Sequence, residues 1–262
     1  MKRIAVLLAA SLLASAHDLY LKPQSFRLQP GAKSTVALHN GDDFPNSEVA
    51  PTLARLREVN VVTASGKQQM TNLRQQDKVA LADFVAPVDS GFLLTTHTIP
   101  NFIELQPKEF EDYLRHEHLD SVVEWRAKDG ETAKPGRERY SKYVKAILHT
   151  GAPSANVTRP VGFTIEFVPL ADPASLKVGQ ELRVQVLFHG QALAGTHVEA
   201  QSLTDGKVRE RQIGSTDPKG EIAIPLDTPG LWKLHTIRME RLNRDKEADW
   251  ESFWASLTFE VN

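Results

Sequence analysis

The residue whose type and position could do chemistry most directly is His17. The segment Ala14-Ser15-Ala16 places small residues at the −3 and −1 positions of an export-signal cleavage site, which predicts that His17 begins the mature chain. A free α-amine and an imidazole nitrogen on one residue form a bidentate chelate for Ni²⁺, Co²⁺, Cu²⁺ or Zn²⁺. The alternative interpretation is that His17 is a mature N-terminus that binds nothing.

Two further histidines could complete such a site. His39 lies at the end of one predicted strand, before Asn40-Gly41, and His97 ends another. Strand ends at one rim of a sandwich can converge on an N-terminus that starts the first strand. The sequence therefore predicts a metal site in which His17 supplies two ligands and His97 or His39 supplies the third. The other histidines are interpreted as surface or core groups: His116, His118, His149, His189, His197 and His235.

The cluster His116-Glu117-His118 does not predict a shared metal. Residues at i and i+2 on a helix lie about 200° apart, so the two rings diverge unless the helix breaks there. Metalloprotease helices need histidines four residues apart, and that spacing is absent here. The cluster is interpreted as a solvated helix face or a helix end.

Two charged or aromatic segments allow alternative interpretations. Arg137-Glu138-Arg139-Tyr140 could clamp an anionic ligand, because guanidinium groups match carboxylate or phosphate oxygens. Charge pairing with the sandwich beneath is the favoured reading of this segment. Trp250 and Trp254, near the final strand, could form a sugar platform, although large aromatics at this position more often anchor a domain interface.

Composition restricts the class of protein and the kind of site. Residues 1–16 combine Lys2 and Arg3, a short apolar run and a small-residue end, which predicts a signal peptide and a periplasmic protein. No later segment is apolar for eighteen residues, so no membrane span is expected in the mature chain. The 31 basic and 33 acidic residues form no basic block, which argues against a nucleic-acid partner. Because Cys is absent and Met occurs only 3 times, a metal must use nitrogen and oxygen ligands.

The hydrophobic periodicity predicts a mainly β protein with a helical insertion. Short alternating segments separated by turns predict a β-sandwich over residues 17–160 and an immunoglobulin-like β-sandwich over residues 161–262. The period changes from 2 to about 3.6 near Pro107, which predicts a helical segment over residues 107–149. Its second helix is expected after Pro135-Gly136, where apolar residues recur at helical spacing through Leu148.

Four motifs in order resemble a known family across essentially the whole mature chain. They are His17-Asp18-Leu19-Tyr20-Leu21-Lys22-Pro23, Phe110-Glu111-Asp112-Tyr113-Leu114, Gly136 to Lys142, and Asp249 to Phe259. The chain resembles a bacterial periplasmic family of unknown function, often labelled as the periplasmic component of cobalt- or nickel-type transport systems. The resemblance implies export, β-sandwich domains, an association with divalent metals and a membrane metal-uptake system as a partner.

These observations favour a periplasmic metal-binding protein of nickel or cobalt uptake or homeostasis, rather than an enzyme. A structural or interaction protein of the cell envelope, without a metal, is the main alternative. A copper-dependent oxidative enzyme that uses the same N-terminal chelate is a second alternative. The sequence leaves the metal's identity and the oligomeric state open.

Overall fold

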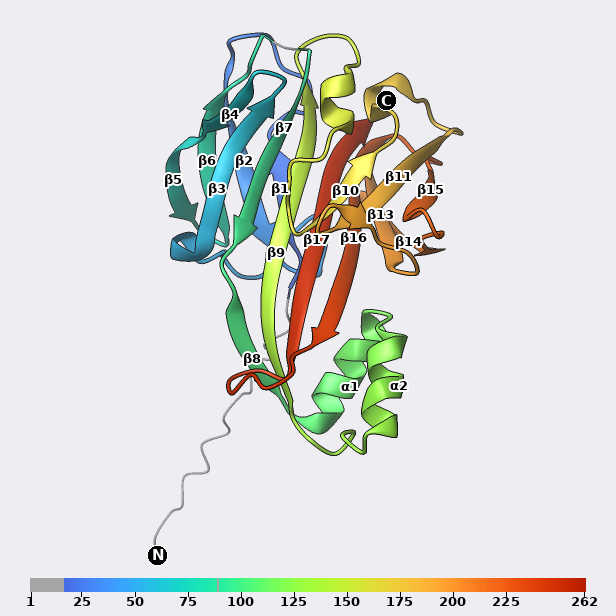
Figure 1. Ribbon diagram of the computed structural model, residues 1–262. Coiled ribbons are helices and arrows are strands. Elements are labelled where there is room, and N and C mark those ends of the chain that lie inside the picture. The colour runs from blue at the N-terminus through green and yellow to red at the C-terminus, as the bar shows by residue number, and fades with distance from the viewer. Residues whose placement is uncertain (1–16, 89) are drawn as a thin grey trace, which may run out of the picture.

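The described part of the chain folds mainly into β-strands, as predicted, and has two short α-helices at one end (Figure 1). A computed structural model describes residues 17–88 and 90–262. The predicted signal peptide and its cleavage site after Ala16 lie outside these residues. No helix in the described part of the chain has both the length and the apolar character that crossing a membrane requires.

The strands in chain order are β1 (Leu19–Pro23), β2 (Lys33–Asn40), β3 (Leu56–Thr63), β4 (Gly66–Gln69), β5 (Thr71–Gln76), β6 (Val79–Val85), β7 (Gly91–Thr98), β8 (Asn101–Leu105), β9 (Gly136–His149), β10 (Ile165–Pro169), β11 (Glu181–Phe188), β12 (Gln191–Ala192), β13 (His197–Thr204), β14 (Lys207–Ser215), β15 (Glu221–Pro225), β16 (Gly230–Arg241) and β17 (Trp250–Val261). The α-helices are α1 (Pro107–His116) and α2 (Asp120–Lys128). Three single-turn 3₁₀ helices lie at Leu53–Arg55, Ala155–Thr158 and Pro173–Ser175.

A nine-stranded sheet forms the centre of the molecule (Figure 1). Its order is β14-β13-β16-β17-β9-β7-β3-β4, and β8 pairs with the N-terminal part of β9. The last strand of the chain, β17, pairs in parallel with β9, from Trp250 opposite Glu138 to Thr258 opposite Ala146. One continuous sheet therefore contains strands from both sides of residue 160.

Two smaller sheets cover opposite faces of this central sheet. β9 shows the arrangement directly, because Val144, Ala146 and Leu148 pack in a core with strands β1, β2 and β6. Ile147, on the other face of β9, packs in a second core with strands β10, β11 and β15. Successive residues of a strand point to opposite faces, so one strand serves both cores. The β-sandwich prediction is therefore confirmed.

The prediction of helix over residues 107–149 is confirmed for its first part and wrong for its last. Pro107 is the first residue of α1, and Gln106 and Glu109 form a capping box at the start of this helix. Both helices pack on Ile237, Met239, Trp250 and Trp254 at the ends of β16 and β17. Residues 136–149, however, form the strand β9.

The physical reason for this error is that β9 is buried on both faces. A strand covered on both sides has apolar residues on consecutive positions, and such a run matches helical spacing as well as strand spacing. A lysine in such a segment is ordinarily expected on a solvated surface. Instead Lys145 is buried and its ammonium group donates to Glu166 Oε2 at 2.8 Å, across the interface with β10.

Candidate metal centre

The start of β1 is fixed against the central sheet by side chains from the last strand. Ser256 Oγ donates to the Leu19 carbonyl at 2.7 Å, and Thr258 Oγ1 donates to the Leu21 carbonyl at 2.6 Å. β1 also pairs antiparallel with β2, with Leu19 opposite Asn40. The residues just before β1 therefore lie beside the residues just after β2.

Asp18 anchors the chain immediately before β1. Its carboxylate accepts from Lys233 Nζ at 2.5 Å, and its other oxygen lies 2.9 Å from His235 Nδ1. Burial alone would raise the pKa of Asp18, but the charges of His235 and Lys233 hold it well below its ordinary value. Asp18 is therefore an ionised carboxylate enclosed by two groups of opposite charge.

His17 is placed by this anchor next to two further carboxylates. Its Nδ1 lies 3.2 Å from Asp42 Oδ2 and 3.2 Å from Glu48 Oε2. The backbone amide of Asp18 donates to the other oxygen of Asp42 at 3.1 Å. The carbonyl of His17 accepts from the ammonium group of Lys142 on β9. The side chain and the backbone of His17 are thus both held in place.

The loop after β2 has a conformation that brings its two carboxylates together. The backbone amide of Asp42 donates to Glu48 Oε2 at 2.8 Å. A Cβ atom on residue 41 would approach the backbone nitrogen of Glu48 to 2.8 Å, so this close approach requires Gly41. The carboxylates remain open to solvent, with side-chain exposures of 48% for Asp42 and 45% for Glu48, so an ion can reach them.

One imidazole and two carboxylates form a nitrogen–oxygen donor set. Ligand atoms bonded at about 2.0–2.2 Å to one ion are separated by about 3 Å. The 3.2 Å distances from His17 Nδ1 to Asp42 and Glu48 are close to this separation. Borderline divalent metals such as Zn²⁺, Ni²⁺ and Co²⁺ accept this combination of ligands.

In the structure each of the other two predicted ligands, His39 and His97, stacks on a tyrosine ring. The His39 ring stacks on Tyr20, with centroids 5.1 Å apart, and burial lowers its pKa to about 4. The His97 ring stacks on Tyr143, with centroids 5.7 Å apart, and burial also lowers its pKa. Among the described residues, neither histidine belongs to a cluster of metal-ligand type, and each has a buried Nδ1 without a hydrogen-bond partner.

Asp42 and Glu48 were missed as candidate ligands. The sequence Asn40-Gly41-Asp42-Asp43 is typical of a turn and does not by itself indicate a ligand. The antiparallel pairing of β1 and β2 places this turn beside residues 17 and 18. The register of the two strands is the signal that could have found them.

Further polar groups adjoin Asp18 and its partners Lys233 and His235. His235 Nε2 contacts Glu117 Oε2 at 3.1 Å. Burial alone would lower the pKa of His235, but Asp18 and Glu117 together raise it to about 10. Burial lowers the pKa of Lys142 to about 8 and raises that of Glu138 to about 7. Charges from β9, β16 and the helices therefore compensate one another in a site shielded from water.

A pocket of about 180 Å³ opens beside Lys142, with Asn40, Arg55 and Tyr140 also in its wall. Lys142 Nζ contacts Asn40 Oδ1 at 3.1 Å, so the pocket shares a wall with the residues that hold the His17 carbonyl. A small molecule could therefore lie next to the N-terminal site.

The arginines of β9 pair with acidic residues. Arg137 makes two hydrogen bonds of 2.9 Å to Asp249, and Arg139 binds Glu251 through Nε at 3.0 Å and Nη2 at 3.2 Å. These contacts confirm the charge-pairing interpretation of the segment. The indole rings of Trp250 and Trp254 are buried under the helices, which confirms their interpretation as interface anchors.

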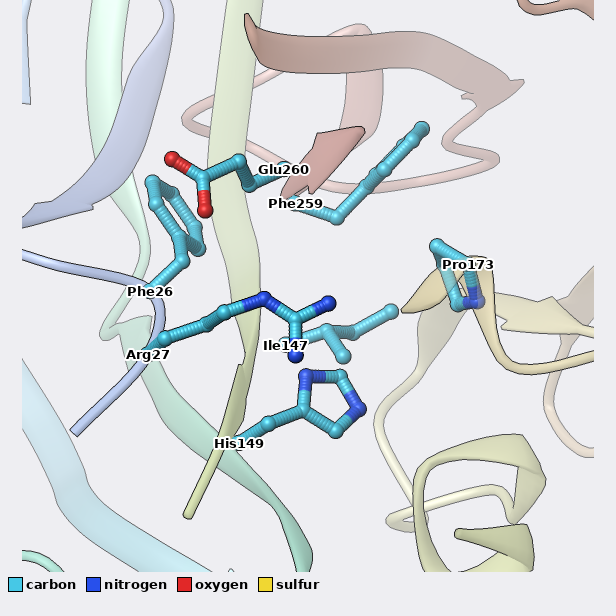
Figure 2. Close-up of a pocket in the computed structure, with 7 residues that line it drawn as sticks. All are labelled: Phe26, Arg27, Ile147, His149, Pro173, Phe259 and Glu260. Atoms are coloured by element: carbon cyan, nitrogen blue, oxygen red, sulfur yellow. The ribbon is translucent and has the colours of Figure 1, made fainter. Parts of the chain in front are cut away.

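Another hollow lies between the Arg27 and Pro173 segments at the opposite end of the sandwiches (Figure 2). Its volume is about 10 Å³, which is room for a single water molecule at most. Figure 2 shows the Arg27 guanidinium and the His149 ring at its centre. His149 Nε2 already contacts Asp172 at 2.8 Å, so this hollow is not a ligand site.

Comparison with known proteins gives a family match. The model of a domain of unknown function, DUF4198, matches residues 14–240. No curated protein matches the chain at a significant level.

Solved structures with a detectable likeness include the Yersinia pseudotuberculosis adhesin InvE, at 11% identity and a TM-score of 0.23, covering 92% of this chain and 58% of the adhesin chain. The D0–D1 domain of intimin matches at 10% identity and a TM-score of 0.20, covering 92% and 97% of the two chains. A DUF4785 protein from Legionella pneumophila matches at 11% identity and a TM-score of 0.23, covering 82% and 50%. TM-scores this low carry no argument about function.

Proposed function

We propose that this chain, which belongs to the DUF4198 family, is a periplasmic protein that binds a divalent transition metal at its mature N-terminus. The observation that carries the proposal is the position of His17 Nδ1, 3.2 Å from both Asp42 and Glu48. Cleavage after Ala16 would add the α-amine of His17 as a further nitrogen donor next to these three groups.

The buried anchor supports this assignment. A mature N-terminus is ordinarily mobile unless it is tied down. Here the residue that follows His17 makes two buried charge-assisted contacts, and Lys142 holds the His17 carbonyl. A donor set held in place before the metal arrives loses less conformational entropy on binding. Such rigidity is of use to a site that must select and retain an ion.

The donor set also indicates which metals are suitable. Nitrogen and carboxylate donors without sulfur suit Ni²⁺, Co²⁺ and Zn²⁺, and an amine with an imidazole also suits Cu²⁺. We propose binding for uptake or homeostasis rather than catalysis, with delivery to a membrane metal-uptake system. The solvent-exposed carboxylates give a partner direct access to the ion.

The first test compares protein that begins at His17 with protein that carries one extra residue before it. The extension turns the amine into an amide without a basic lone pair, so Ni²⁺ and Cu²⁺ affinity should fall at least about tenfold, a typical loss for a perturbed metal site. His17→Ala should weaken binding at least as much, and Asp42→Asn or Glu48→Gln should also weaken it. Isothermal titration calorimetry and native mass spectrometry measure both affinity and stoichiometry.

His116→Ala is the matched control, because His116 is an exposed histidine at the end of α1 and should leave the first affinity unchanged. Equal affinity in the native, extended and His17→Ala proteins would contradict the proposed function and favour a metal-free envelope protein.

A further inference from the structure

A second cluster of metal-ligand type lies between the helices and β13. It consists of His118, His197 and Glu199, whose ligand atoms all lie within 4.8 Å of one another. The two imidazole rings stack with centroids 3.9 Å apart, and His118 Nε2 lies 3.6 Å from Glu199 Oε1. This cluster shares no residue with the cluster around His17.

The three side chains come from two elements that are far apart in the sequence. His197 and Glu199 are two residues apart on β13 and therefore point to the same face of the sheet. His118 lies in the linker between α1 and α2 with a φ of 54°, in the left-handed region. The residue before it, Glu117, points inward to His235, while His118 reaches Glu199. Two successive residues of the linker, Glu117 and His118, thus contact different strands, β16 and β13.

Gln212 on β14 determines which nitrogen of His197 carries the lone pair. The amide nitrogen of Gln212 donates to Glu199 Oε1 at 2.9 Å, so its oxygen must face the other way. That oxygen lies 2.6 Å from His197 Nε2, and this nitrogen must therefore be the protonated donor. His197 Nδ1 is then the acceptor nitrogen. Histidines that bind metals are commonly oriented in this way, by a hydrogen bond from the nitrogen that does not bind.

We propose that His118, His197 and Glu199 form a second binding site, for Zn²⁺. Two imidazoles and one carboxylate are a frequent donor set for zinc, which accepts water as its fourth ligand. Solvent can reach the ligands, because the side chains of His118 and Glu199 are 37% and 29% exposed. Tetrahedral bonds of about 2.0–2.1 Å require donors about 3.3 Å apart. The ligand atoms lie within 4.8 Å of one another, so the stacked rings must rotate for both nitrogens to face one ion.

A metal here would tie the helical insertion to the edge of the central sheet. β13 is next to the edge strand β14, whereas α1 and α2 pack in a cluster with residues of β8, β9, β16 and β17. The ion would therefore link the residues between α1 and α2 directly to β13.

The test uses processed protein carrying His17→Ala, so that zinc bound at the N-terminal site does not obscure the result. Titration with zinc chloride, followed by native mass spectrometry and calorimetry, should show one Zn²⁺ per chain. His118→Ala or His197→Ala, added to that protein, should weaken zinc binding at least about tenfold. Glu199→Gln should also weaken it while preserving the size of the side chain.

His116→Ala in the same background is the matched control and should retain the full zinc affinity. Thermal unfolding gives a second readout, because a ligand that binds only the folded state raises the melting temperature. Zinc should raise it in the His17→Ala and the His17→Ala/His116→Ala proteins but not when His118 or His197 is also replaced. Melting temperatures measured without zinc identify any variant that has simply lost its fold, and Glu199→Gln then provides the decisive comparison.

Absence of zinc binding in the His17→Ala protein would overturn the second site. The same conclusion follows if the His118, His197 and Glu199 variants bind zinc as tightly as the His116→Ala control. Failure of the N-terminal site is distinguishable, because it would appear as unchanged Ni²⁺ affinity on His17→Ala while zinc binding at the second cluster persisted.

Discussion

Replacing Asp18 with asparagine is expected to lower the free energy of unfolding by about 3–5 kcal/mol, the usual cost of removing one partner from a buried ion pair. Lys233 and His235 both contact the Asp18 carboxylate, and both are buried. The variant would leave the buried Lys233 ammonium group without its carboxylate partner, and His235 with Glu117 alone. Because His17 is positioned by its neighbour, metal affinity at the N-terminus should fall as well.

Chemical denaturation of wild-type and Asp18→Asn protein measures this difference in unfolding free energy. Asp112→Asn is the matched control, since Asp112 forms an exposed ion pair with Lys108 on α1 and such pairs contribute little. An Asp18→Asn protein as stable as the Asp112→Asn protein would show that the anchor does not stabilise the fold.

The stabilisation that His235 provides is expected to depend on pH. Its pKa is raised to about 10 in the folded protein, against about 6.5 for an ordinary histidine. Below pH 6.5 the ring is protonated in both states and its contribution is complete. Between pH 6.5 and 10 only the folded state keeps the proton, so the contribution declines, by up to about 1.4 kcal/mol per pH unit. Above pH 10 it is lost.

The measurement is the difference in unfolding free energy between wild-type and His235→Gln protein across pH 5–10. The difference should be largest near pH 5–6 and should shrink steadily towards pH 10. Taking the difference removes the contributions of Lys142 and Glu138, whose pKa values of about 8 and about 7 also fall in this range. The exposed residue His116, replaced in the same way, should give no such slope. A His235→Gln penalty that is constant with pH would contradict the expected charge state.

Local sequence pattern predicted most of the strands, because strands with one solvated face alternate apolar and polar residues. The strands β11 (Glu181–Phe188) and β15 (Glu221–Pro225) both lie within residues 161–262, for which alternating segments predict a β-sandwich. The pattern failed at β9, where both faces are buried and the polar residues find partners from other strands. Such partners, Glu166 for Lys145 among them, depend on tertiary packing that no local window contains.

The candidate metal centre was predictable only in part. His17 stood out because its position after the predicted cleavage site gives it an unusual chemistry. The choice of His39 and His97 as further ligands rested on the idea that strand ends converge, and the structure instead stacks their rings on Tyr20 and Tyr143. The metal-ligand prediction for these two residues stays untested. Asp42 and Glu48 are the residues that lie next to His17 in a cluster of metal-ligand type.

The parallel pairing of β17 with β9 has a consequence for the order in which the chain can fold. The last strand lies in the middle of the nine-stranded sheet, between β16 and β9, and its side chains hold the first strand. A chain that emerges with its N-terminus first cannot complete the second core until residues 250–261 are available, because Phe253, Leu257 and Phe259 belong to that core. Until then β9 has an unpaired edge, which is a site for aggregation. Contacts over so great a sequence separation also slow folding. A chain of this design is therefore exposed to aggregation until its last strand has taken its place between β16 and β9.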